Sequence, residues 1–129
     1  MTEVYFIRHS LRDNAIYDDM DVPLTAEGEK RALILADAFA NVSIEQIFSS
    51  PFQRSVRTLN PLAHSKNLEI QLISDFRERN VGHEIADFWP FAKRQWKDFD
   101  YKLADGESLR EVQNRNISAL EQILSLIHI

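Results

Sequence analysis

Two short apolar segments of this chain each end at a turn that carries ionisable side chains. Residues 3–7 are β-branched and aromatic, and Arg8 and His9 come directly after them. Residues 46–49 form the second segment, and Arg54 follows it after a short turn. Short runs of this kind predict buried strands. The chain is therefore expected to place a histidine and two arginines just beyond the ends of two strands.

Helical patterns alternate with these strands. Thr25 is the expected N-cap of a helix that ends near Asn41. A second helix is expected to begin at Ser50, with Pro51 at its first position and Gln53 completing a capping box. The other expected elements are a strand at 68–73, an irregular segment at 76–82, an aromatic helix at 85–99 interrupted near Pro90, and a helix opened by a capping box at 108–111.

This order of elements predicts an α/β fold, a three-layer domain in which helices cover both faces of a parallel sheet. In such sheets ligands bind beyond the carboxyl ends of the strands. His9 follows the first expected strand and Arg54 follows the second. We therefore expect these side chains to lie close together at one edge of the sheet.

Composition narrows the class of protein. The 129 residues suffice for one domain, and 44% of them are hydrophobic, which is enough for a core. A net charge of -5 argues against a nucleic-acid partner, and the absence of cysteine excludes disulfides and thiolate sites. No apolar run approaches the ~20 residues of a membrane helix. No signal-peptide pattern is visible, so we expect a cytoplasmic protein without membrane association.

The residues at the expected sheet edge suit phosphoryl transfer. A neutral imidazole such as His9 can attack phosphorus to give a phosphohistidine, which water then hydrolyses. The planar forks of Arg8 and Arg54 can each donate two hydrogen bonds to phosphoryl oxygens. A leaving alkoxide needs a proton, and Glu78, in the irregular segment after the third strand, is the candidate acid. This chemistry requires neither a metal nor a cofactor.

Each of these signals alone has a plainer interpretation. A histidine at a strand end is usually a hydrogen-bonded structural residue. Arg54 alone would be a solvated arginine at a helix start, and Glu78, beside Arg77 and Arg79, would be a surface charge.

Other polar and aromatic groups are better explained without catalysis. The acidic run Asp18, Asp19 and Asp21 is more simply a solvated loop than a Mg²⁺ site. His64 and His83 have no partner pattern and are expected to be structural or exposed. The aromatic residues of the expected helix at 85–99 should pack in the core rather than line a substrate pocket. They are Trp89, Phe91, Trp96 and Phe99.

Taken jointly, the motifs resemble those of the histidine phosphatase superfamily, the group that includes cofactor-dependent phosphoglycerate mutases. The resemblance runs through almost the whole chain. In chain order the matching segments are Arg8-His9-Ser10, Pro23-Leu24-Thr25-Ala26-Glu27-Gly28, Ser49-Ser50-Pro51-Phe52-Gln53-Arg54 with Thr58, Glu78 with Gly82, and Gly106-Glu107-Ser108 followed by Arg115.

The resemblance implies a phosphoglycerate mutase-like fold and a set of roles. His9 would accept the phosphate, Arg8 and Arg54 would clamp it with Ser10 as a further contact, and Glu78 would be the general acid and base. Ser10 stands where the family has glycine, which alters the approach of the backbone to a ligand. Asn14 lies near the position of an asparagine in the mutases but does not align with it.

The family also has a second catalytic histidine, in a Ser/Thr-His-Gly context on a strand after the last helix. His128 lacks the glycine and is not its equivalent. The sequence therefore predicts the N-terminal portion of one histidine phosphatase domain, residues 1–129, incomplete at the C-terminus and impaired or inactive as it stands. Residues 124–129 can be encoded by a transposase adapter used in sequencing libraries, so a further hypothesis is that this tail is not native.

The expected activity is hydrolysis of a small-molecule phosphomonoester through a phosphohistidine. One alternative is a cofactor-dependent phosphoglycerate mutase; the central segment 82–105 offers modest material for a lid, which favours the hydrolase. The other alternative is a non-catalytic phosphate-ligand or protein-binding module, because the second histidine is missing.

Overall fold

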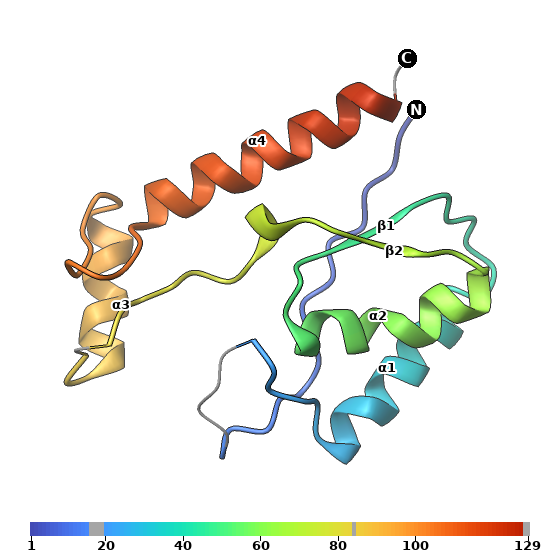
Figure 1. Ribbon diagram of the computed structural model, residues 1–129, viewed down its shortest axis with the longest axis horizontal. Coiled ribbons are helices and arrows are strands. Elements are labelled where there is room, and N and C mark those ends of the chain that lie inside the picture. The colour runs from blue at the N-terminus through green and yellow to red at the C-terminus, as the bar shows by residue number, and fades with distance from the viewer. Residues whose placement is uncertain (16–19, 84, 128–129) are drawn as a thin grey trace. The chain divides into compact units, whose positions relative to one another are not determined.

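The computed structural model describes residues 1–15, 20–83 and 85–127, which form two compact units, 1–74 and 75–129. Each unit is described by itself. The first contains, in chain order, α1 (Ala26–Ala38), β1 (Ile47–Ser49), α2 (Gln53–Lys66) and β2 (Ile70–Leu72) (Figure 1). A single turn of 3-10 helix, η1 (Ser74–Phe76), follows β2. The second unit contains α3 (Phe88–Lys97) and α4 (Leu109–Ile127).

The sheet of the first unit consists of β1 and β2, which run parallel. Ile47 lies opposite Ile70, and Ser49 lies opposite Leu72. Parallel strands need a crossover connection, and α2 supplies it. This strand–helix–strand unit confirms the predicted α/β class and the predicted parallel pairing.

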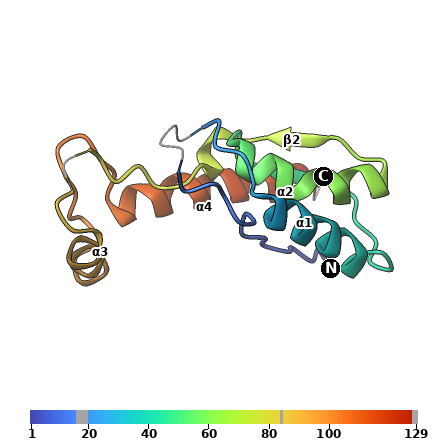
Figure 2. The same cartoon turned by 90° about the horizontal axis from the view of Figure 1, so that it is seen from below.

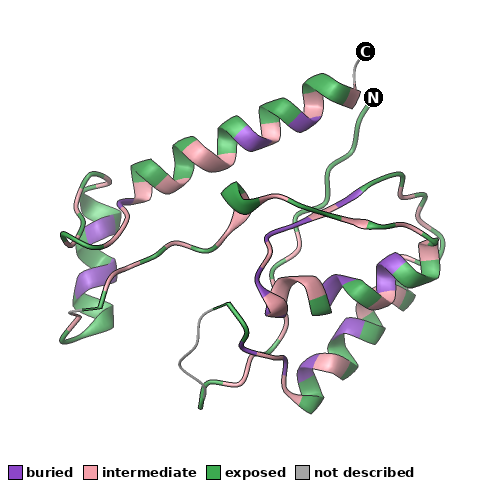
Figure 3. Cartoon of the chain, in the orientation of Figure 1, coloured by how far each residue is buried: buried purple, intermediate pink, exposed green. Residues whose placement is uncertain are grey.

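The core of the first unit forms where α2 packs on the sheet and on α1. Figure 2 shows α1 and α2 lying side by side, and Figure 3 shows buried residues at intervals along α2. Burial of each large apolar side chain contributes about 1.5–3 kcal/mol. The buried cluster consists of Ile47, Leu59, Leu62 and Ala63, with partly buried side chains of Ile7, Ala36, Phe39, Ile44, Leu68 and Ile70 packed against it.

Residues 3–7 do not form the buried strand that the sequence predicts. Phe6 is 79% exposed, and Val4 and Tyr5 are also exposed. Among the described residues β1 and β2 pair with each other alone, so this segment has no ladder of hydrogen bonds to join. Only Ile7 packs on the core, and the Tyr5 ring meets Phe39 edge-on at 5.1 Å between centroids. β-propensity does not make a strand without a neighbouring strand.

The start of α1 is as predicted, whereas the start of α2 is not. Thr25 caps α1, since its Oγ1 accepts a hydrogen bond from Gly28 N at 3.0 Å. Helix α1 ends at Ala38, before the predicted Asn41. Helix α2 begins at Gln53 with Phe52 at the N-cap and no side-chain cap, so the predicted capping box at Ser50 is wrong. The Gln53 N–H instead donates to the Met20 carbonyl at 2.9 Å, a partner distant in sequence.

Helix α4 begins with the predicted capping box. Glu111 N donates to Ser108 Oγ at 3.1 Å, and Ser108 N donates to Glu111 Oε2 at 3.4 Å. Helix α3 is not interrupted at Pro90, which lies in its first turn. A proline there removes an N–H that has no partner within the helix in any case.

The two tryptophans of the second unit are not core residues. Helix α3 buries the face that carries Phe91, Ala92 and Gln95. Trp89 and Trp96 are 71% and 67% exposed. The prediction of core packing is correct for Phe91 and wrong for both tryptophans, because a helix of this length buries a single stripe.

None of the helices in the described part of the chain combines the length and the apolar character that a membrane span requires.

Candidate active site

The loop that follows His9 lies against the start of α1. Thr25 N donates to the Leu11 carbonyl at 2.9 Å, and Asp13 N donates to the Pro23 carbonyl at 3.0 Å. A Cβ at Gly28 would stand 2.4 Å from the Leu11 oxygen, so only glycine allows the loop to approach so closely. The first turn of α1 therefore sets the position of residues 10–13.

Ser10 is held by both helices of the first unit. Its N–H donates to Thr58 Oγ1 on α2 at 2.8 Å. Its hydroxyl donates to the carbonyl of Gly28 on α1 at 2.9 Å. A serine has one N–H and one O–H to donate. In this structure both donors of Ser10 are therefore used by protein acceptors.

The same Thr58 hydroxyl also contacts the backbone of Arg54. Thr58 Oγ1 donates to the Arg54 carbonyl one turn earlier, at 2.6 Å. Arg54 is 1% exposed, and the central carbon of its guanidinium lies 4.8 Å from the ring centre of Phe52. The structure thus brings the His9–Ser10 peptide next to the first turn of α2, where Arg54 is located. A helix N-terminus and a guanidinium both favour an anion.

The His9 ring has a defined orientation. Its Nδ1 lies 2.7 Å from the Ser10 carbonyl oxygen, and a carbonyl can only accept. Nδ1 therefore carries a proton, and in the neutral imidazole the lone pair is on Nε2. The His9 side chain is half-buried, and the neighbouring Arg8 is exposed.

Glu78 belongs to the second unit and has an exposed side chain. Its segment is held by Arg115 of α4, which the motif match had noted without a role. Arg115 Nη1 donates to the carbonyls of Asp75 and Arg77 at 2.6 and 2.7 Å, and Nη2 donates to the Glu78 carbonyl at 3.4 Å. The backbone that carries Glu78 is thus tied to α4.

Glu107 also holds the Glu78 segment against α4. Its carboxylate accepts hydrogen bonds from Arg115 Nε at 2.9 Å and from Asn80 N at 2.9 Å. Burial acts to raise the pKa of Glu107, but the hydrogen bonds from Arg115 and Asn80 outweigh it and leave the pKa below the ordinary value. Glu107 is consequently ionised at neutral pH. The sequence contains a signal for the inward position of Arg115. At helical spacing, Arg115 falls on the same face of α4 as Val112 and Ala119.

His83, expected to be structural or exposed, is exposed and contacts an acidic side chain. Its Nδ1 lies 2.8 Å from Asp105 Oδ2, and hydrogen bonds from His83 lower the pKa of the Asp105 carboxyl. Gly82, the residue before His83, has φ of 93°, and a Cβ there would stand 2.4 Å from Asp105 Oδ1. The pair therefore fixes a turn on the surface of the second unit.

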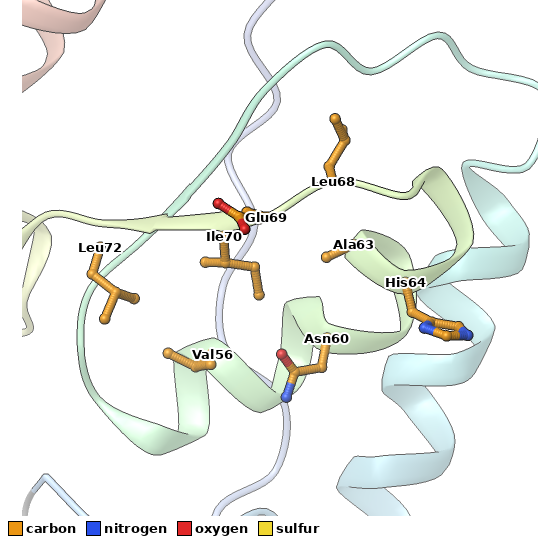
Figure 4. Close-up of a pocket in the computed structure, with 8 residues that line it drawn as sticks. All are labelled: Val56, Asn60, Ala63, His64, Leu68, Glu69, Ile70 and Leu72. Atoms are coloured by element: carbon orange, nitrogen blue, oxygen red, sulfur yellow. The ribbon is translucent and has the colours of Figure 1, made fainter.

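One pocket of the first unit lies apart from the predicted site residues. A pocket of about 580 Å³ lies between α2 and β2 (Figure 4). His64, Asn60 and Glu69 are its polar lining residues. It opens on the face of α2 that carries Val56 and Asn60, whereas Arg54 and Thr58 are on the buried face.

Two predictions concern residues outside those that the structure describes. Asp18 and Asp19 of the acidic run, and His128, fall there. Asp21 is exposed. Within residues 1–15, 20–83 and 85–127 no three acidic or histidine side chains come together as metal ligands.

The sequence profile of the histidine phosphatase superfamily (branch 1) matches residues 4–127, and the chain belongs to this superfamily. Among curated proteins it is 30% identical to a probable phosphoglycerate mutase of Shigella dysenteriae, over 98% of this chain and 65% of that protein. A probable phosphoglycerate mutase of Escherichia coli matches with the same identity and coverage. The chain thus spans about two thirds of the length of these relatives.

Solved structures show the same fold. A mycobacterial glucosyl-3-phosphoglycerate phosphatase in complex with inorganic phosphate superposes with a TM-score of 0.76 at 21% identity, covering 91% of this chain and 60% of that one. The α-ribazole phosphatase of Shigella flexneri superposes with a TM-score of 0.75 at 18% identity, covering 95% and 67%. The predicted family and the predicted fold class are confirmed, and the neighbours act on small phosphorylated molecules.

Proposed function

We propose that this chain belongs to a phosphomonoester hydrolase that works through a phosphohistidine on His9. The observation that supports this most strongly is the 2.8 Å hydrogen bond from Ser10 N to Thr58 Oγ1. It links the peptide after His9 to the turn of α2 that carries Arg54. Membership of the superfamily supports the same assignment.

In the first step, the Nε2 lone pair of His9 forms a bond to phosphorus as the bond from phosphorus to the ester oxygen breaks. Arg8 and Arg54 neutralise the phosphoryl oxygens, which is the main contribution a protein can make to phosphoryl transfer. The leaving oxygen takes a proton from the carboxylic acid of Glu78 and departs as an alcohol.

In the second step, the Glu78 carboxylate accepts a proton from water while the water oxygen attacks phosphorus. The bond from phosphorus to Nε2 breaks, inorganic phosphate leaves, and neutral His9 and protonated Glu78 are restored. Ser10, predicted as a further phosphate contact, can donate to the phosphate only by giving up its hydrogen bond to Thr58 or Gly28.

A phosphoglycerate mutase is the second candidate, since relatives 30% identical to this chain are named as probable mutases. A mutase needs the same acceptor histidine but returns the phosphate to the substrate. Incubation with labelled 3-phosphoglycerate separates the two: a hydrolase releases labelled phosphate, and a mutase yields labelled 2-phosphoglycerate.

The direct test is to trap the phosphoenzyme. Formation of labelled protein is the measurement, because the label identifies the residue that accepts the phosphate. We expect acid-labile label on the wild type and on a His64→Ala control, because His64 is an exposed histidine of α2 that lines the separate pocket. We expect none on His9→Ala.

Two outcomes would contradict the proposal. Label that persists in His9→Ala would place the acceptor elsewhere. Absence of label on the wild type, with saturable binding of the same phosphomonoester, would favour the non-catalytic phosphate-binding module instead.

A further inference from the structure

Thr58 occupies an unusual position for a hydroxyl. It is 3% exposed and lies in the second turn of α2, among side chains that form the core of the first unit. Its hydroxyl makes two contacts, accepting from Ser10 N at 2.8 Å and donating to the Arg54 carbonyl at 2.6 Å. A threonine that bonds back to the carbonyl four residues earlier has used its only proton locally. Its lone pair is then directed to the Ser10 amide.

Ser10 transmits this contact to the imidazole. Its N–H belongs to the peptide bond that joins it to His9, and its carbonyl accepts from His9 Nδ1 across 2.7 Å. A displacement of the Ser10 backbone would therefore move the carbonyl that keeps the proton on Nδ1. The identity of the nucleophilic nitrogen, Nε2, depends on this carbonyl.

The serine side chain adds a second attachment that glycine cannot make. Ser10 Oγ donates to the Gly28 carbonyl of α1 at 2.9 Å, and the loop beyond it packs so tightly on Gly28 that no Cβ would fit. The Ser10 backbone is thus fixed from α2 through Thr58 and from α1 through its own hydroxyl.

We propose that Thr58 is a positioning residue for the His9 nucleophile, because its hydroxyl joins the His9–Ser10 peptide to the turn of α2 that carries Arg54. The inference rests on the proposed function for its role in phosphoryl transfer, and on the hydrogen bonds alone for its effect on His9. Ser10 acts with it as a positioning residue rather than as a phosphate ligand.

The test compares three variants on α2 of the full chain. Thr58→Val removes the hydroxyl and keeps the shape of the side chain, and Thr58→Ser keeps the hydroxyl and removes the methyl. Ser65→Ala removes a hydroxyl that donates to the Leu62 carbonyl of the same helix. Long-range proton–nitrogen spectra report the tautomer of His9. We expect a single tautomer protonated on Nδ1 in the wild type, Thr58→Ser and Ser65→Ala, and a mixture of both tautomers in Thr58→Val.

Titration with inorganic phosphate, followed by the His9 ring signals, gives the second readout. Loss of one hydrogen bond that orders the site should weaken phosphate binding about three- to tenfold in Thr58→Val, with Thr58→Ser close to the wild type. A wild type whose His9 signals do not respond to phosphate would refute the proposed function. The tautomer comparison would still decide the role of Thr58.

The inference is overturned if folded Thr58→Val keeps the wild-type tautomer and phosphate affinity. If Thr58→Val fails to fold, hydrogen exchange of the Ser10 amide in the wild type tests whether Thr58 holds that amide. A Ser10 amide that donates no stable hydrogen bond exchanges as fast as a free peptide, which would contradict the inference. Strong protection of that amide, lost in Thr58→Ala, would support it.

Discussion

At the scale of single residues, the most informative feature is how Gly28 and Ser10 set the His9 loop. The Gly28 carbonyl accepts from Ser10 Oγ, and the missing side chain of Gly28 leaves room for the Leu11 carbonyl. One glycine thus provides both a hydrogen-bond acceptor and the space for close approach. Its role depends on absence of a Cβ and not on any unusual φ, since Gly28 lies within α1.

Gly28→Ala is expected to destabilise the first unit. Replacing glycine by alanine within a helix normally stabilises it by up to about 1 kcal/mol. Here the new Cβ would stand 2.4 Å from the Leu11 oxygen, and overpacking of this kind costs roughly 1–3 kcal/mol. Urea unfolding would measure the free energy, and the sign of the change is decisive. An unchanged or increased free energy of unfolding would contradict the described contact.

Sequence alone could identify His9, Arg54 and Glu78 as candidates, because motif spacing records residue type and order. It could not assign the attachments of Ser10. Those depend on Thr58 and Gly28, which lie 48 and 18 residues away. Ser10 stands where the family motif has glycine, which marks a departure from the motif. Only the three-dimensional arrangement shows which carbonyl the Ser10 hydroxyl donates to.

At the scale of elements, local signals predicted local structure. The Thr25 cap and the Ser108–Glu111 capping box are confirmed because each uses residues within one turn. The predictions of a strand at residues 3–7 and of the start of α2 were wrong, because both features depend on partners distant in the sequence. The first has no neighbouring strand among the described residues, and the second begins where Gln53 N reaches the Met20 carbonyl.

The attachment of the Glu78 segment to α4 is expected to weaken in acid. Because the folded-state pKa of Glu107 lies below its unfolded value, Glu107 stabilises the fold at higher pH. This stabilisation is lost as the pH falls from the ordinary glutamate value of about 4.3 through the lower folded-state pKa. The protection of the amides of residues 75–80 against exchange, relative to an unstructured peptide at the same pH, should therefore fall across that range in the wild type.

Glu107→Gln provides the control for this prediction. Glutamine keeps the approximate shape and cannot ionise, so the acid-dependent loss of amide protection should be reduced in this variant. Asp105 and Glu111 also have lowered pKa values and remain in both proteins, so the difference between the two isolates Glu107. Identical pH profiles for the wild type and Glu107→Gln would contradict the assignment.

At the scale of the whole molecule, the proposed chemistry divides between the two compact units. His9, Arg54 and Thr58 belong to residues 1–74, and Glu78 with its attachments belongs to residues 75–129. We propose that residues of the first unit accept the phosphate and that Glu78 of the second transfers the proton. These two tasks can be separated by the choice of leaving group, since a good leaving group needs little help from an acid.

Glu78→Gln should therefore slow labelling of His9 selectively. With an alkyl phosphomonoester we expect a loss of about 10²–10⁴-fold in the rate of phosphoenzyme formation, which is typical of general acid catalysis. With p-nitrophenyl phosphate the loss should be much smaller. Glu69→Gln, an exposed glutamate beside β2, should change neither rate. Equal losses with both substrates would show that Glu78 does not act as the acid.

We propose that His9 and Arg54 bind one anion together, and nitrogen-detected titration of the chain with inorganic phosphate separates this from binding by either side chain alone. We expect the ring signals of His9 and the guanidinium signals of Arg54 to shift with one common midpoint and a stoichiometry of one phosphate per chain. Separate midpoints for the two side chains, or a response of His9 without Arg54, would contradict it.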